Sequence, residues 1–213
     1  GERASESSFF FLHRLAGLWD AELTAVAIAE FDRPDVVDEV FGRALQELMQ
    51  QHAPGVDDLA MRRISEQRVE VGRRLEILAA SLLAHGADPH WAAVWCLIRD
   101  DVARGTRILS GALDFQREAK FCQKLSDDEA ADLSIWLERH YPSAEDPRRH
   151  GVFMPGPLDL IAGLKRTLLS TLLHRATEGS YRQLQRMQRE KVCPTDFVWT
   201  LIAAHRALVA RGW

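Results

Sequence analysis

Long apolar runs are missing from this sequence. No stretch reaches the length of about 18 apolar residues that a membrane helix needs, and the most apolar segment, Leu23 to Ala29, is far shorter. Cysteine is scarce too: Cys96, Cys122 and Cys193 lie far apart and form no C-x-x-C pair. This usage disfavours a thiolate zinc site and is typical of a reducing compartment. We therefore expect a cytoplasmic protein with no membrane partner.

Motifs for catalysis and for phosphate binding are also lacking. The sequence holds no nucleophile elbow and no G-x-x-x-x-G-K-[ST] loop. Residues 163–167 place a lysine near a threonine, but they lack the glycine loop and fall inside an amphipathic helix, so we reject them as a phosphate site. The histidines include no pair at the i, i+4 spacing of H-E-x-x-H; His85 and His90, and His140 and His150, flank helix ends instead. We expect no enzymatic activity, no metal and no cofactor in this chain.

What the chain does contain is helical periodicity. Its 46% hydrophobic content is too high for a disordered chain, and apolar residues recur every three or four positions. No segment alternates as a half-buried strand would. Helices of about 11 to 20 residues joined by short turns predict an all-α fold, an irregular HEAT-like solenoid of about five stacked antiparallel helix pairs. The clearest stripes are Val71, Leu75, Leu78 and Leu82; Trp91, Val94, Trp95 and Ile98; Leu133, Trp136, Leu137 and Tyr141; and Leu160, Ile161, Leu164, Leu168 and Leu172.

Capping signals mark several helix starts. Asp88 directly precedes Pro89. This is the arrangement of an N-cap residue followed by a proline at the first helical position. Ser126 and Glu129 have the spacing of a capping box, in which each side chain accepts the other residue's backbone N–H. Thr177 is expected to cap a helix that runs through Lys191.

The helical stripes also predict which side chains are buried. In the last helix, which opens at Pro194 and Thr195, we place Val198, Leu201, Ile202 and Leu208 inside. Elsewhere the core is expected to contain Trp91, Trp95, Leu133, Trp136, Leu137, Leu164 and Leu168. At this spacing among valines and leucines, tryptophans are core residues more often than platforms for stacking bases.

The longest irregular stretch spans residues 142–157 and contains four prolines and two glycines. Long loops in compact domains are often functional, so we take it as a recognition candidate with the contact residues Tyr141, Glu145, Asp146 and Arg149. The alternative is a rigid crossover that packs on neighbouring helices. We expect residues 1–213 to form a single helical-repeat domain, a piece of a larger protein, whose array this loop divides.

Charge is spread unevenly along the chain. Residues 165–213 carry nine Lys or Arg against three acidic residues, a net charge of +6, although the whole chain is at −4. Arg182, Arg186 and Arg189 share one helix face and are candidates for contact with a phosphate or an acidic partner. The alternative is a solvated face that Glu178 and Glu190 partly neutralise.

One region resembles a known family. Residues 125–137, LSDDEAADLSIWL, run into residues 140–147, HYPSAEDP, as in a segment that follows the NTPase in large bacterial NACHT-type STAND proteins. The flanks resemble the same family through the tryptophan-rich HWAAVW of residues 90–95, the pair Asp100 and Asp101, and HRATEGSY at residues 174–181. The resemblance covers roughly residues 70–191. It does not include the family's NTPase, because this chain has no phosphate loop.

The resemblance implies a function that the composition does not. It implies the non-catalytic sensor or regulatory arm of a bacterial STAND NTPase, an NLR-like protein of antiphage defence. Its partners would be a macromolecular trigger, expected to be a protein, and neighbouring domains of the parent chain. A helical nucleic-acid-binding domain that uses the basic C-terminal third is the alternative.

Overall fold

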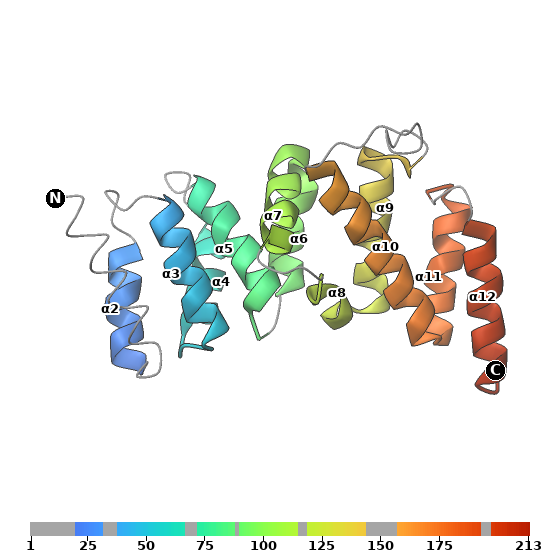
Figure 1. The fold of residues 1–213 in the computed structure, drawn as a ribbon, viewed down its shortest axis with the longest axis horizontal. Helices are drawn as coiled ribbons and strands as arrows, with labels where there is room; N and C mark the ends of the chain where they lie inside the picture. Colours follow the sequence, from blue (N-terminus) through green and yellow to red (C-terminus); the bar gives the residue numbers. More distant parts are fainter. Residues whose placement is uncertain are drawn as a thin grey trace. The chain divides into compact units, whose positions relative to one another are not determined.

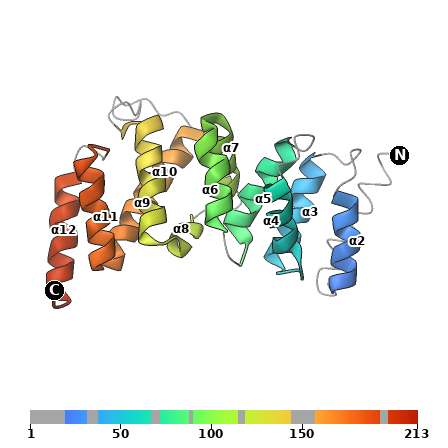
Figure 2. The same cartoon turned by 180° about the vertical axis from the view of Figure 1, so that it is seen from behind.

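The computed structural model describes residues 20–31, 38–66, 72–87, 90–114, 119–143, 157–192 and 197–213. Within these ranges every regular element is a helix and no strand occurs, which confirms the all-α prediction. The helices group into two compact units, residues 1–117 and 118–213 (Figures 1 and 2). The HEAT-like solenoid, and the single domain divided at residues 142–157, stay predictions.

The first unit contains helices close to the predicted positions. As predicted, a turn at residues 52–55 separates the second helix from the third, and His52 and Gly55 adopt positive φ angles there. The predicted cap of α6 (Trp91–Asp100) is wrong: the helix begins at Trp91 with His90 as its N-cap, and Asp88 itself lies outside the described residues. The helices of this unit are α2 (Ala21–Phe31), α3 (Asp38–Gln50), α4 (Val56–Glu66), α5 (Gly72–His85), α6 (Trp91–Asp100) and α7 (Val102–Asp114).

Helix α5 forms the centre of the first unit. It packs most extensively on α3 and α7, which are its second neighbours along the chain. Contact on both sides leaves little of the helix exposed: Leu78, Ala79, Leu82 and Leu83 are each exposed by 3% or less. The predicted stripe of α5 is therefore correct at Leu75, Leu78 and Leu82, while Val71 lies outside the described residues, and the buried surface is wider than one stripe.

The tryptophan pair of α6 is buried only in part, contrary to the prediction. Trp91 is 6% exposed, whereas Trp95 is half-buried. The two rings stack with their centroids 5.3 Å apart. Because they lie four positions apart on one helix face, Trp91 can enter the core while Trp95 covers its outer side.

Gly105 allows α6 and α7 to meet in a close corner. A Cβ atom at position 105 would lie 2.6 Å from the carbonyl oxygen of Ile98 and 3.1 Å from its Cα. The substitution Gly105→Ala must therefore move the backbone, and we expect it to lower the free energy of unfolding by about 1–3 kcal/mol. Chemical denaturation measures this loss. Gly72→Ala in the same unit is the control, because a Cβ there meets nothing within 4 Å; equal stability of the two variants would contradict the close corner.

The second unit adds one short helix that the sequence did not predict. This helix, α8, precedes the helix that Ser126 caps. The helix after Thr177 ends at Arg189, two residues before the predicted end. The helices of this unit are α8 (Phe121–Lys124), α9 (Asp127–His140), α10 (Pro157–Arg175), α11 (Glu178–Arg189) and α12 (Phe197–Ala210).

Both predicted caps of the second unit are present. The Ser126 hydroxyl accepts the backbone N–H of Glu129 at 3.2 Å, and the Glu129 carboxylate accepts the N–H of Ser126 at 2.7 Å. Thr177 and Ser180 form the same reciprocal arrangement at 3.0 Å each. Because these bonds satisfy N–H groups that a helix leaves unpaired, they fix where α9 and α11 begin.

The predicted core of the second unit is confirmed. Helix α9 packs on α10 and α11. Leu133 and Leu137 are fully buried, Trp136 is 6% exposed, and Leu164 and Leu168 of α10 expose 1% or less. The stripes of α9 and α10 were therefore assigned to the correct faces.

The predicted inner face of α12 is wrong. Val198 and Ile202 are 56% and 37% exposed, although Leu208 is buried as predicted. The less exposed apolar side chains of this helix are Phe197, Leu201, Ala204 and Leu208. Because apolar residues occur on every side of α12, their spacing alone does not show which side faces the core.

Candidate functional site

The predicted contact residue Tyr141 ends helix α9 and is half-buried. Its backbone N–H donates to the carbonyl of Leu137 at 2.8 Å, and its carbonyl accepts a hydrogen bond from the Lys165 ammonium. Its ring lies 6.4 Å from that of Trp136, centroid to centroid. Tyr141 is thus held against the core at the start of the loop. The other loop candidates, Glu145, Asp146 and Arg149, lie outside the described residues.

A buried ion pair anchors the chain just after Tyr141. The Lys165 ammonium lies 3.2 Å from a carboxylate oxygen of Glu138, and the two side chains are 11% and 7% exposed. Ser143 donates its backbone N–H (2.9 Å) and its hydroxyl (2.5 Å) to the same carboxylate. This pair was not predicted from the sequence, although Glu138 and Lys165 each follow directly after a leucine of the predicted core.

The basic face of α11, made of Arg182, Arg186 and Arg189, is largely neutralised by acidic side chains. Arg182 pairs with Glu178 one turn away. Arg186 pairs with Glu190 at 2.9 Å and with Asp132 of α9 at 2.8 Å. The hydrogen bond to Glu190, followed by the contact with Asp132, raises the pKa of the Arg186 guanidinium.

Among the described residues, only Arg189 of these three arginines makes no ion pair. Arg186 connects α11 to α9 through its pair with Asp132, so a ligand would have to compete with this pair. Arg182 and Arg186 are thus paired with acidic side chains, and Arg189 is the exposed arginine of this face that has no ion pair within the described ranges.

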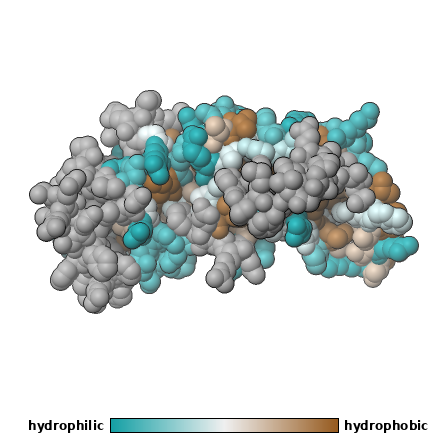
Figure 3. Space-filling model, turned by 45° about the horizontal axis from the view of Figure 1, so that its top comes forward, coloured by the Kyte–Doolittle hydropathy of each residue, from teal (hydrophilic) through white to brown (hydrophobic). Residues whose placement is uncertain are grey.

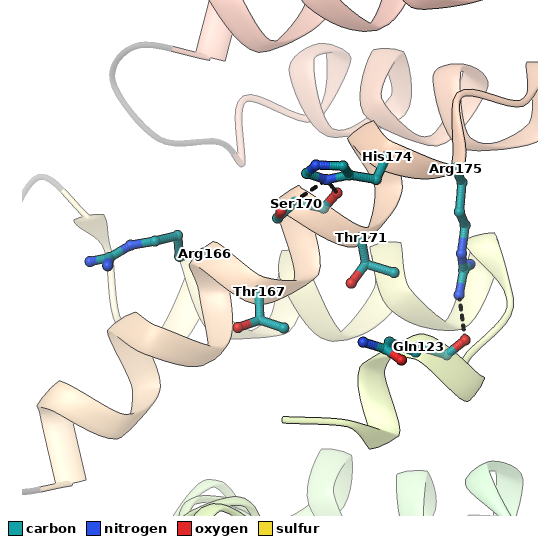
Figure 4. A pocket seen from close by; sticks show the side chains of 7 residues that line it. All are labelled: Gln123, Arg166, Thr167, Ser170, Thr171, His174 and Arg175. Atoms are coloured by element: carbon teal, nitrogen blue, oxygen red, sulfur yellow. Dashed lines mark hydrogen bonds between the residues drawn. The ribbon is translucent and has the colours of Figure 1, made fainter. Parts of the chain in front are cut away.

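An open, shallow pocket of about 580 Å³ lies along α10 beside α8 (Figure 4). No acidic side chain lines it, so it can attract an anion. Its donors do not converge, however, because Arg175 is bound to Asp127 at 2.8 Å and Figure 4 shows Arg166 directed away from the other side chains. Its lining consists of Gln123, Arg166, Thr167, Ser170, Thr171, His174 and Arg175.

Among the described residues of the second unit, every exposed large apolar side chain lies on helix α12 or at the C-terminus that follows it. Five large side chains, which we call the α12 face, lie on the outward side of this helix and at the C-terminus that follows it. In Figure 3, brown hydrophobic surface appears at the end where α12 lies. Exposed apolar surface of this size is typical of a contact with another macromolecule. The α12 face consists of Val198 (56% exposed), Trp199 (71%), Ile202 (37%), Val209 (52%) and Trp213 (57%).

The C-terminus is packed against the helices of its own unit. Trp213 makes edge-to-face contacts with Tyr181 of α11 and His205 of α12, with centroids 5.8 and 6.0 Å away. The guanidinium of Arg211 donates to the carbonyl of Arg175 at 2.6 Å. The end of the α12 face is therefore held in a defined position.

Cysteine and metal chemistry have little basis in the described residues. Burial raises the pKa of the Cys122 thiol to about 12, so this group stays protonated and unreactive at neutral pH, while Cys96 is exposed. Cys193 lies outside the described residues. No three His, Cys, Asp or Glu side chains in the described ranges are grouped so that they could hold a metal ion. None of the helices described is long and apolar enough to cross a membrane.

The described site residues therefore comprise the loop base at Tyr141, hydrogen-bonded at the start of the loop, a largely neutralised basic face on α11, and an exposed apolar face on α12. Comparison of the chain with protein-family models, with curated proteins and with solved structures finds no match.

Proposed function

We propose that this chain is the non-catalytic sensor or regulatory arm of a bacterial NACHT-type STAND NTPase, and that it binds a macromolecular trigger, a protein, in antiphage defence in the cytoplasm. The resemblance at residues 125–147 supports the family. The α12 face supports the binding of a protein trigger, and the proposal depends mainly on this observation.

The chemistry of the α12 face favours a protein partner over a nucleic acid. Protein interfaces are enriched in aromatic side chains, and Trp199 and Trp213 are 71% and 57% exposed on this surface. A nucleic-acid site needs unpaired cations that can replace the counterions of phosphates. On α11, Arg182 and Arg186 are already paired with acidic side chains, which weakens the alternative function.

Binding by itself does not make a sensor. A trigger shifts an NTPase between two states only if it binds one state more tightly than the other. The loop base offers a way to transmit such a difference, because the Glu138–Lys165 pair connects the residues after Tyr141 to α10 in the core. A trigger that contacts the chain at Ser143 would therefore act on a residue that is hydrogen-bonded to this pair.

The proposal is tested in the parent protein with a phage-challenge assay. Trp199→Asp and Val209→Asp place charges on the α12 face without touching the core, and we expect each to reduce protection at least about tenfold at an unchanged melting temperature. Gln185→Asp, at an exposed polar position of α11, is the matched control. Full protection by both α12 variants would contradict a role for this face.

A second experiment tests the alternative function, nucleic-acid binding. Binding of DNA and RNA to the purified chain is measured as salt is raised. Affinity that falls steeply with salt, and that is lost in Arg189→Glu, would replace the proposal with nucleic-acid binding. If Arg182→Glu and Arg189→Glu leave both phage protection and nucleic-acid binding unchanged, the basic face of α11 has no role in recognition.

A further inference from the structure

The outward side of α12 is almost wholly apolar, and its polar groups are basic or neutral. In addition to the α12 face, Ala203 and Ala210 are exposed on this side. His205 and Arg206 are the exposed polar side chains there, and α12 contains no acidic residue. Arg206 makes no ion pair among the described residues. Helices that are apolar on every side are usually buried on every side, so this surface is suited to a further helix.

Helix α2 of the first unit has a complementary outward side. Eight of its eleven residues are apolar and none is basic. Among the α2 side chains that the structure describes, the exposed ones, three of them alanines, lie on one side of the helix, opposite Thr24, which is only 1% exposed. Helix α2 packs mainly on α4, and the outward side chains described on this helix are exposed. We define the α2 face by the exposed residues Ala21, Glu22, Ala25, Val26 and Ala29.

We propose that the α12 face packs against the α2 face of a second copy of this chain. The bulky side chains of α12 would lie over the row formed by Ala21, Ala25 and Ala29, whose small side chains allow two helices to approach closely. The charges are complementary as well. Glu22 and the helix cap Asp20 are exposed acidic groups on α2, whereas Arg206 is the exposed cation of α12.

A symmetric contact between two α12 faces fits less well. It would bring bulky side chains against bulky side chains and would place two Arg206 guanidinium groups in one interface without an acidic partner. The α12–α2 contact instead joins two different surfaces, so it is heterologous and leads to chains or rings of copies rather than to a closed pair. One helix pair buries less than the roughly 1,200 Å² of a stable interface, so we expect a weak association, in the micromolar range.

The inference goes beyond the proposed function, because a second copy and a protein trigger would compete for the same α12 face, and it is tested separately. Analytical ultracentrifugation of the purified 213-residue chain is expected to show a mass that rises with concentration above the monomer mass of 24.1 kDa. Trp199→Ser is expected to weaken this self-association more than tenfold. Because Trp199 is 71% exposed, the variant should keep its melting temperature.

A charge exchange identifies the partner surface. Glu22→Arg and Arg206→Glu should each weaken self-association about fivefold, because each places like charges opposite one another. The double variant restores opposite charges in exchanged positions and should return to within about twofold of the original protein. Arg189→Glu, on α11, is the control and should change nothing.

Three results would overturn the inference. The first is a chain that stays monomeric at high concentration. The second is an association that responds to Arg206→Glu but not to Glu22→Arg, which would indicate a symmetric α12 contact. The third is a double variant that is weaker than both single variants. If the chain is monomeric while Trp199→Asp still abolishes phage protection, the proposed function stands and only the second copy is rejected as the partner.

Discussion

Replacing Glu138 with alanine is expected to lower the free energy of unfolding of the second unit by about 3–5 kcal/mol. Glu138 is 7% exposed and faces the Lys165 ammonium at 3.2 Å, so its removal leaves a cation that is only 11% exposed without its counterion. The two hydrogen bonds from Ser143 lose their acceptor at the same time. The cost of an uncompensated buried charge is much larger than the net benefit of the pair, and urea denaturation measures it.

Two further variants separate this cause from a general loss of packing. In Glu138→Leu combined with Lys165→Met no buried charge remains, so we expect most of the lost stability to return. Glu178→Ala removes the acidic partner of Arg182 in a pair whose side chains are 48% and 69% exposed, and should change stability by less than about 1 kcal/mol. A loss below about 1 kcal/mol for Glu138→Ala would mean that water reaches Lys165, and would contradict the anchored loop base.

Where a helix has one apolar stripe and a clear cap, its position and inner face could be predicted from the sequence. Helix α9 shows this: Ser126 and Glu129 determine its start, and Leu133, Trp136 and Leu137 determine its inner face. Both signals are local, because a cap and a stripe each involve residues within a few positions of one another. The all-α class follows from the same local signals repeated along the chain.

The prediction failed where the local pattern does not distinguish one face from another. In α12 the apolar residues surround the helix, so Val198 and Ile202 could not be separated from Phe197 and Ala204 by spacing. Trp95 shows a smaller form of the same problem, since a stripe marks a direction but not the depth to which each side chain is buried. In both helices, the burial of each side chain depends on which other helices pack nearby.

The candidate site was less predictable than the fold, because its contacts join residues far apart in the sequence. Glu138 and Lys165 belong to different helices, as do Asp132 and Arg186. No spacing rule predicts such pairs, whereas the pairing of Arg182 with Glu178 follows from the i, i+4 geometry of one helix. The basic face was therefore predicted from its sequence pattern, but the neutralisation of Arg186 by Asp132 was not.

Truncating Trp136 to alanine is expected to cost about 3–5 kcal/mol, because a large ring is removed from a core that cannot fully close around the cavity. Trp136 is 6% exposed, and its ring lies 4.8 Å from that of His140, centroid to centroid. Its indole N–H is buried without an acceptor among the described residues. Trp136→Phe should therefore cost much less, about 1–2 kcal/mol, since it keeps most of the apolar volume and removes a donor that makes no hydrogen bond.

The two variants are compared with the original protein by urea denaturation followed by circular dichroism, and the transition of the second unit is evaluated by itself if the two units unfold separately. A Trp136→Ala variant that unfolds within error of the original protein would show that Trp136 is a surface contact and that the inner face of α9 is wrongly assigned. An equal loss in Trp136→Phe and Trp136→Ala would contradict the argument from the unpaired N–H, because it would mean that the indole nitrogen, and not the volume of the ring, stabilises this core.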